Sequence, residues 1–241
     1  MGCRSSSERY VVAADSTGRL VLQRGHKKLL LKYAPHFVPT RAPTATDEDL
    51  MTQSWDDIIG CKLRAEIERR KAPSTEPSPE APTTTSAIVQ FYDTFFSHLY
   101  VINPETRSVF RNSMHVQSKA LVNIVGAIRH VLHSDDAKNM VAAMAVRHIQ
   151  YGVKLEYFDN LGVAMIQTLS KLAGTTWTTA MADAWHTVIA YIICLIVPHY
   201  MKGKHTKNHQ HLLGRVASLS TRVNIMRVAV DYAGPPVPAP Q

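Results

Sequence analysis

A histidine on the apolar face of a predicted helix, His148, constrains the fold of this chain more than any other feature of its sequence. Met140, Met144 and His148 recur at positions i, i+4 and i+8, which is the spacing of a single helix face. The imidazole is therefore expected to point into an interior lined by thioether and aliphatic groups. A hydrogen-bonded core histidine is the alternative that stays open for this residue taken alone.

The surroundings of His148 narrow the kind of metal that it could bind. No second histidine, cysteine or carboxylate lies near it at ligand spacing. Zinc needs three or four protein ligands, so this environment suits zinc poorly. A neutral imidazole in an apolar pocket suits a metal whose other ligands come from a macrocycle, and this chemistry points to heme.

A series of motifs accompanies His148 between residue 55 and about residue 200. They are Phe95-Phe96-Ser97-His98-Leu99-Tyr100, Asn103-Pro104-Glu105, Val109-Phe110, Gln117-Ser118-Lys119-Ala120-Leu121, Arg147-His148-Ile149-Gln150-Tyr151-Gly152, Leu161-Gly162, Trp177-Thr178 and Ala184-Trp185. Together they resemble the globin family. The closest likeness in style is to single-domain globins similar to the heme domain of flavohemoglobins, and to the lipid-anchored animal globins known as globin X. The resemblance implies an all-α globin fold, a three-over-three helical sandwich, around one heme b.

The resemblance also implies roles for residues on the proximal side of the heme. His148 is expected to coordinate the iron through Nε2, while its Nδ1–H donates to a backbone carbonyl of the same helix. Phe110 is expected to stack on the porphyrin. Met144 and Leu161 are expected to pack beneath it.

On the distal side the resemblance places Gln117, with Leu121 one helical turn later. The Gln117 amide is expected to donate to the gas ligand, although a half-exposed position at the helix edge is an alternative for it. Phe96 stands where many flavohemoglobin-type globins carry tyrosine, so a second donor is absent and very tight oxygen binding is in doubt. His115 lies about 160° around the helix from Gln117, which disfavours two histidine ligands unless the register shifts.

Three functions are compatible with these residues. The first is reversible binding of dioxygen, NO or CO at a five-coordinate iron, for oxygen binding and transport. The second is an enzyme, a nitric-oxide dioxygenase or nitrite reductase. It would need an external reductase, because the chain has no glycine-rich dinucleotide loop and no length for a flavin domain. The third is a gas or redox sensor. Nucleic acid is not expected as a partner, because the basic segments lack interleaved aromatic residues.

The apolar periodicity predicts an almost wholly helical chain. The predicted helices cover residues 48–70, 86–100, 115–132, 135–151, 158–173 and 178–199, and weak strand patterns occur at residues 10–12 and 20–22. The segment Ser134-Asp135-Asp136 is a candidate N-cap for the helix that carries His148. Residues 72–86 are rich in proline and threonine and are expected to form a disordered insertion.

Charge divides the chain into three parts. Residues 1–33 carry seven Lys and Arg against two acids, and residues 199–241 carry six against one, whereas residues 34–198 sum to −2. Together with the globin resemblance, which implies a globin domain at 47–200, this pattern predicts a basic N-terminal extension at 1–46 and a basic amphipathic C-terminal extension at 201–241. Both extensions also contain apolar residues. An anionic membrane, a calmodulin-like partner and packing on the globin are the alternatives for them.

The first residues favour a membrane. Met1-Gly2-Cys3 with Ser6 fits the myristoylation pattern at Gly2, and Cys3 is a candidate for palmitoylation. The globin X type shares this start, and the expected location is the cytoplasmic face of a membrane. No signal peptide or bilayer-spanning segment is expected, because the longest apolar run, residues 188–197, is short.

Scattered cysteines and histidines add little to these expectations. Three scattered cysteines predict no disulfide framework. The histidines at 199, 205, 209 and 211 are a weak candidate for metal.

Overall fold

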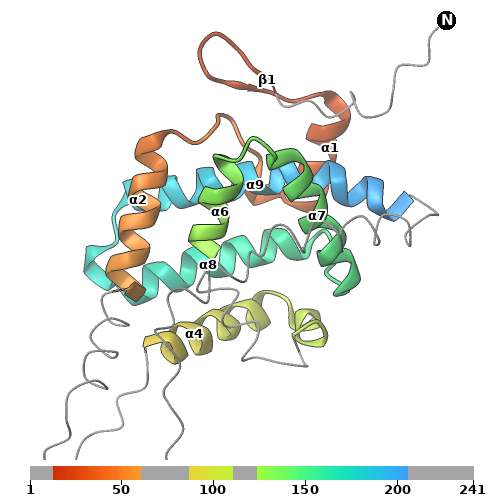
Figure 1. Cartoon of the computed structure of the whole chain (residues 1–241). Helices are drawn as coiled ribbons and strands as arrows, with labels where there is room; N and C mark the ends of the chain where they lie inside the picture. Colours follow the sequence, from red (N-terminus) through yellow and green to blue (C-terminus); the bar gives the residue numbers. More distant parts are fainter. Residues whose placement is uncertain (1–12, 61–86, 111–123, 206–241) are drawn as a thin grey trace, which may run out of the picture.

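The computed structural model describes residues 13–60, 87–110 and 124–205. Helices dominate this part of the chain (Figure 1). The α-helices are α1 (Arg24–Tyr33), α2 (Ala45–Trp55), α4 (Ala87–Ile102), α6 (Ile124–Leu132), α7 (Ala137–Gln150), α8 (Tyr157–Ala173) and α9 (Thr179–His205). Shorter turns are the 3-10 helices η2 (Pro35–Phe37), η4 (Pro104–Ser108) and η5 (Gly174–Thr176), and the π-helix η3 (Asp56–Gly60).

The long helices form two packed layers. In Figure 1, α8 and α9 run beside each other through the middle of the molecule, and α4 lies along α8. α2 and α7 pack across α9, and α6 joins them by contacting both α2 and α7. The all-α fold predicted from the periodicity is confirmed, and this packing agrees with the three-over-three sandwich that the resemblance implies.

Aromatic residues from three helices fill the core between these layers. On α4, Phe91, Phe95 and Leu99 are fully buried at successive i, i+4 positions. The Trp55 ring meets the Phe91 ring edge-on at 5.3 Å. The indole of Trp185 on α9 is buried, and its N–H donates to the Ser54 hydroxyl at 2.9 Å. This bond satisfies a polar group that burial would otherwise leave unpaired.

The predicted helices match the observed ones in their centres and differ at their ends. α2 begins at Ala45, because Thr44 and Asp47 form a capping box. The Arg41 guanidinium bonds the same carboxylate and holds the pKa of Asp47 well below its usual range. α2 ends at Trp55 and continues as the π-helix η3 to Gly60, while residues 61–70 of the predicted helix lie outside the described residues.

The expected N-cap of α7 is partly wrong. Asp136 occupies the N-cap position, but its side chain caps no backbone N–H. The carboxylate instead accepts from the Asn139 side chain, and the backbone carbonyl of Asp136 accepts from the N–H groups of Asn139 and Met140. Ser134 Oγ accepts from the N–H of Asp136, so the short polar side chains order the turn before the helix rather than its first turn.

α9 is longer than predicted, and it carries Pro198 inside the helix. Its stretch Thr179–Gly203 is long and apolar enough to cross a membrane by length and composition, so the expectation that no segment reaches that length was wrong. The same helix packs against α1, α2, α7, α8 and η2, and its side chains from Val188 to Val197 are mostly buried. This packing is that of the central helix of a folded core.

The basic segment before α2 is folded onto the helical domain. β1 (Ala13–Ala14) and β2 (Leu20–Val21) form an antiparallel hairpin, while the predicted strand at residues 10–12 lies outside the described part. α1 follows the hairpin and contacts α9 (Figure 1). Of the alternatives for this segment, packing on the domain is therefore realised. The insertion at 72–86 and the extension from 206 onward lie outside the described residues.

One close approach fixes this segment in place. The Phe37 ring lies over Gly162 of α8, where a Cβ would come within 2.5 Å of Phe37 Cε2. A glycine is needed there because any larger residue would displace the ring. His36 adds a polar anchor beside it: its Nδ1 and Asp159 Oδ2 are 2.8 Å apart, and its backbone N–H donates to Asp159 Oδ1.

Candidate cofactor site

His148 lies near the end of α7 with one ring nitrogen held by its own helix. Its Nδ1 is 2.8 Å from the backbone carbonyl oxygen of Met144. Since a carbonyl can only accept, Nδ1 carries the proton in this contact and Nε2 keeps its lone pair. Within the described part of the chain, no residue provides a hydrogen-bond partner for Nε2. The imidazole is thus set up as a neutral ligand with its donor nitrogen available.

The environment of His148 favours the neutral form. Burial lowers the pKa of the imidazole, the bond to the Met144 carbonyl opposes that effect, and the charge of Arg147 lowers the pKa further. The Phe158 ring from α8 lies 5.2 Å from the imidazole, centroid to centroid. The neutral imidazole is the form in which histidine binds a metal.

The end of α7 explains why His148 is held so firmly. Gly152 has φ 75°, and the Val153 N–H donates to the His148 carbonyl at 3.0 Å. The Gly152 N–H donates to the Ile149 carbonyl at 3.1 Å. This pair of bonds is a Schellman motif, which needs a left-handed residue and hence favours glycine at that position. The motif fixes the backbone of His148 directly.

The other proximal candidates lie on the helices that surround His148. Met144 precedes His148 by one turn of α7, is partly buried and packs against the core. Leu161 is partly buried on α8, three residues after Phe158 and therefore on the same helix face. Sequence reasoning missed Phe158, although its i, i+3 spacing from Leu161 was a signal that could have identified it.

Phe96 and Phe110 come together in a separate aromatic cluster. Phe96 is buried on α4, and its ring meets the Phe110 ring at 5.3 Å and 63°. Tyr100, one turn after Phe96, stacks on it at 5.6 Å, and the Arg107 guanidinium covers the Tyr100 ring. Among the described residues, no ring contact joins this cluster to His148 and Phe158. The cluster of Phe96, Tyr100 and Phe110 is therefore separate from the pair formed by His148 and Phe158.

The distal candidates Gln117 and Leu121 lie outside the described residues, as does His115. Their roles stay predictions. Gly2 and Cys3 lie outside the described residues as well.

Of the weaker metal candidate only His199 has a described side chain, because the histidines at 209 and 211 lie outside the described residues, so this site stays a prediction. His199 is partly buried on α9, where burial and the nearby Lys138 and Lys202 lower its pKa. No group of three or more His, Cys, Asp or Glu side chains that could hold a metal ion occurs within residues 13–60, 87–110 and 124–205. Cys194 is a buried free thiol.

The sequence around His148 is similar to known proteins. The globin family model matches residues 93–194, from within α4 to within α9, and this stretch includes His148. A flavohemoprotein of Vibrio cholerae serotype O1 is 29% identical over 100 residues, which are 39% of this chain and 24% of that protein. The chain therefore spans about a quarter of the length of this curated relative. The family match and the all-α fold agree: residues 93–194 form a globin domain.

Proposed function

We propose that this globin binds heme b with His148 Nε2 as the protein ligand to the iron. The observation that carries the proposal is the state of the imidazole: Nδ1 is bonded to the Met144 carbonyl, and Nε2 has no partner within the described residues. The donor set fits heme, because one neutral nitrogen in an apolar setting is sufficient when four others come from a macrocycle. The name of the Vibrio cholerae relative, a flavohemoprotein, supports the same cofactor.

The surrounding residues would hold the cofactor by apolar contact. Met144 and Leu161 supply aliphatic and thioether surface near His148, and Phe110 supplies an aromatic face. Burying these groups against a large flat ligand removes apolar surface from water, which stabilises the complex. Phe96 carries no hydroxyl, and the donor that we propose on the gas side is Gln117, which the globin resemblance assigns to that role together with Leu121 one helical turn later.

We further propose that the bound heme supports reversible binding of dioxygen and other diatomic gases at its iron. The full chain, loaded with heme and reduced, tests this directly. Its absorption spectrum should change when dioxygen is admitted and return when the gas is removed. Irreversible oxidation on the first exposure to dioxygen would contradict a reversible carrier.

The Gln117 amide gives a sharper prediction. Replacing Gln117 with leucine removes the N–H donor at nearly constant volume. A hydrogen bond of this kind contributes about 0.5–1.5 kcal/mol, so dioxygen should dissociate several-fold faster while CO, which carries less charge, changes little. Stopped-flow measurement of both dissociation rates checks this. Equal effects on the two gases would mean that Gln117 acts as a steric gate or faces solvent.

The location that we propose is the cytoplasmic face of a membrane, with acyl chains on Gly2 and Cys3. One myristoyl chain binds membranes only marginally, so a second chain is needed for stable anchoring. Gly2→Ala should release the protein to the soluble fraction, because palmitoylation of Cys3 depends on the first membrane contact. Cys3→Ser should leave weaker binding that salt disrupts. Cell fractionation decides between these outcomes, and a Gly2→Ala protein that stays wholly with membranes would contradict the anchor.

A further inference from the structure

α1 has two faces with different chemistry. The inward face packs on the globin: Leu30 is fully buried, and His26 Nε2 lies 3.7 Å from Cys194 Sγ of α9. Burial lowers the pKa of His26 and raises that of the Cys194 thiol to about 12, so both groups are neutral inside this contact. The helix is therefore held in one orientation on the domain, and its outward face is defined.

The outward face is cationic with an exposed leucine. Arg24, Lys27, Lys28 and Leu31 follow one another at i, i+3, i+4 and i+7, are all exposed, and line one shallow hollow. We call these four residues the α1 surface. Leu31 has an exposed fraction of 53%, which is large for a leucine. No carboxylate among the described residues pairs with the three cations, and the first turn of α1 contains no acid.

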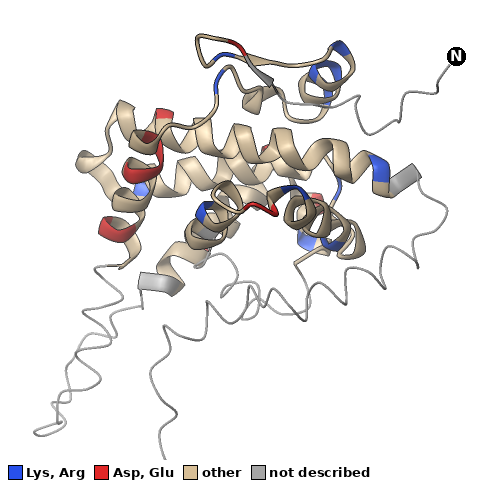
Figure 2. Ribbon diagram, turned by 45° about the horizontal axis from the view of Figure 1, so that its top comes forward, with Lys and Arg blue, Asp and Glu red and all other residues tan. Residues whose placement is uncertain are grey.

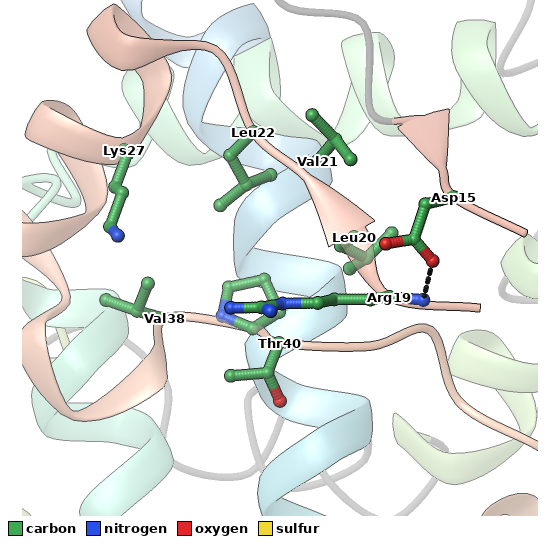
Figure 3. Close-up of a pocket in the computed structure, with 9 residues that line it drawn as sticks. Asp15, Arg19, Leu20, Val21, Leu22, Lys27, Val38 and Thr40 are labelled. Carbon is green, nitrogen blue, oxygen red and sulfur yellow. Dashed lines mark hydrogen bonds between the residues drawn. The ribbon is translucent and has the colours of Figure 1, made fainter. Parts of the chain in front are cut away.

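The hairpin extends this surface. Val21 is 55% exposed, and it lines a second hollow that Lys27 and Arg19 share (Figure 3). Asp15 also lines this hollow, but its carboxylate already accepts from the Thr17 hydroxyl and from the Arg19 N–H. Asp15 keeps its negative charge in these bonds, but the hollow also holds Arg19 and Lys27, so its lining is net cationic with exposed apolar groups beside the cations.

The acids of the domain gather elsewhere. In Figure 2 several acidic residues colour the ribbon of α2, with others elsewhere, while basic residues colour α1 and further segments. Asp47 is bonded to Arg41, and Glu48 Oε2 lies 2.6 Å from His133 Nε2, so much of that acidity is internally paired. The charge distribution gives the domain a preferred orientation toward a negative surface.

We propose that the α1 surface docks the globin domain on an anionic phospholipid bilayer. Arg24, Lys27 and Lys28 contact headgroup phosphates, while Leu31 and Val21 enter the boundary between headgroups and acyl chains. Charge complementarity selects an anionic occupant. The exposed leucine within the cations favours a lipid interface, where long cationic side chains keep their charge in water above buried apolar groups. This contact needs no acyl chain and can be measured with excess vesicles, but it is weaker than a two-chain anchor and does not by itself keep the Gly2→Ala protein in the membrane fraction.

Vesicle binding by the unacylated full chain tests this. The protein carrying Gly2→Ala is mixed with vesicles of phosphatidylcholine plus phosphatidylserine, or of phosphatidylcholine alone, and the bound fraction is measured by sedimentation. Lys27→Glu/Lys28→Glu should weaken binding to the anionic vesicles at least about 30-fold, from the loss of two cations near the surface. Leu31→Ala should weaken it several-fold and make the remaining binding more sensitive to salt.

A matched control separates this surface from net charge. Lys138→Glu/Lys171→Glu makes the same change in charge at exposed positions on α7 and α8, whereas the contacts of α1 are mainly with η2 and α9. The control should bind like the parent, and thermal melting should be similar for all variants. Equal losses in the two double variants would overturn the proposal, because binding would then follow net charge or another basic segment. Equal binding to both kinds of vesicle would overturn it as well.

Discussion

His148→Ala is expected to abolish stable heme uptake by this protein. The substitution removes the nitrogen that we assign to the iron and leaves apolar contacts as the remaining source of cofactor affinity. Free imidazole, which fits the space of the lost ring and supplies the same donor, should restore heme binding. Titration of the full chain with heme, followed by absorption spectroscopy with and without imidazole, measures both effects.

His130→Ala is the matched control for this experiment. His130 is exposed on α6, so the His130→Ala protein should bind heme as the parent protein does. Full heme retention by His148→Ala, with an unchanged ferrous spectrum, would show that another residue holds the iron. The hydrogen bond from His148 to Met144 would then be the pairing of an ordinary core histidine.

Phe37→Ala should cause a large loss of stability. The ring is 1% exposed, fills the space above Gly162 and stacks on His186 at a centroid distance of 5.0 Å. Truncating a buried phenylalanine to alanine typically lowers the free energy of unfolding by about 3–5 kcal/mol, through lost burial and the cavity left behind. Chemical denaturation of the full chain measures the change.

Val101→Ala is the control for Phe37→Ala. Val101 is 81% exposed on α4, so its truncation should change the free energy of unfolding by less than about 0.5 kcal/mol. A loss below about 1 kcal/mol for Phe37→Ala would contradict a firmly docked N-terminal segment. Such a result would also contradict the fixed orientation of the α1 surface, because that orientation depends on the same packing.

The helical fold and the position of His148 could be predicted from sequence because both rest on local periodicity. The Met140, Met144 and His148 spacing placed the imidazole on an apolar face, and α7 shows that face with Met140 buried. The end of α7 at Gly152 is also local, because the backbone hydrogen bonds that close the helix there join residues three to five positions apart. Local rules of this kind need no knowledge of the rest of the fold.

The packing of the N-terminal segment could not be predicted in the same way. His26 meets Cys194, and Phe37 meets Gly162, across more than a hundred residues of chain. Such contacts depend on tertiary geometry that a leucine-rich basic stretch does not encode by itself. The same reason applies to Ser54, whose hydroxyl accepts the Trp185 N–H from a distant helix. The spacing of Phe158 to Leu161 gives the face of α8 on which it lies, but its contact with the His148 ring depends on how α8 and α7 come together.

The absorption spectrum of the reduced, heme-loaded full chain, recorded with and without CO, tests the central claim most directly. His148 as the one protein ligand predicts a high-spin, five-coordinate ferrous spectrum that converts completely to a low-spin spectrum when CO is added. A low-spin six-coordinate ferrous spectrum before CO would mean that a second side chain occupies the iron. A chain that takes up no heme in stoichiometric amount would contradict the account altogether.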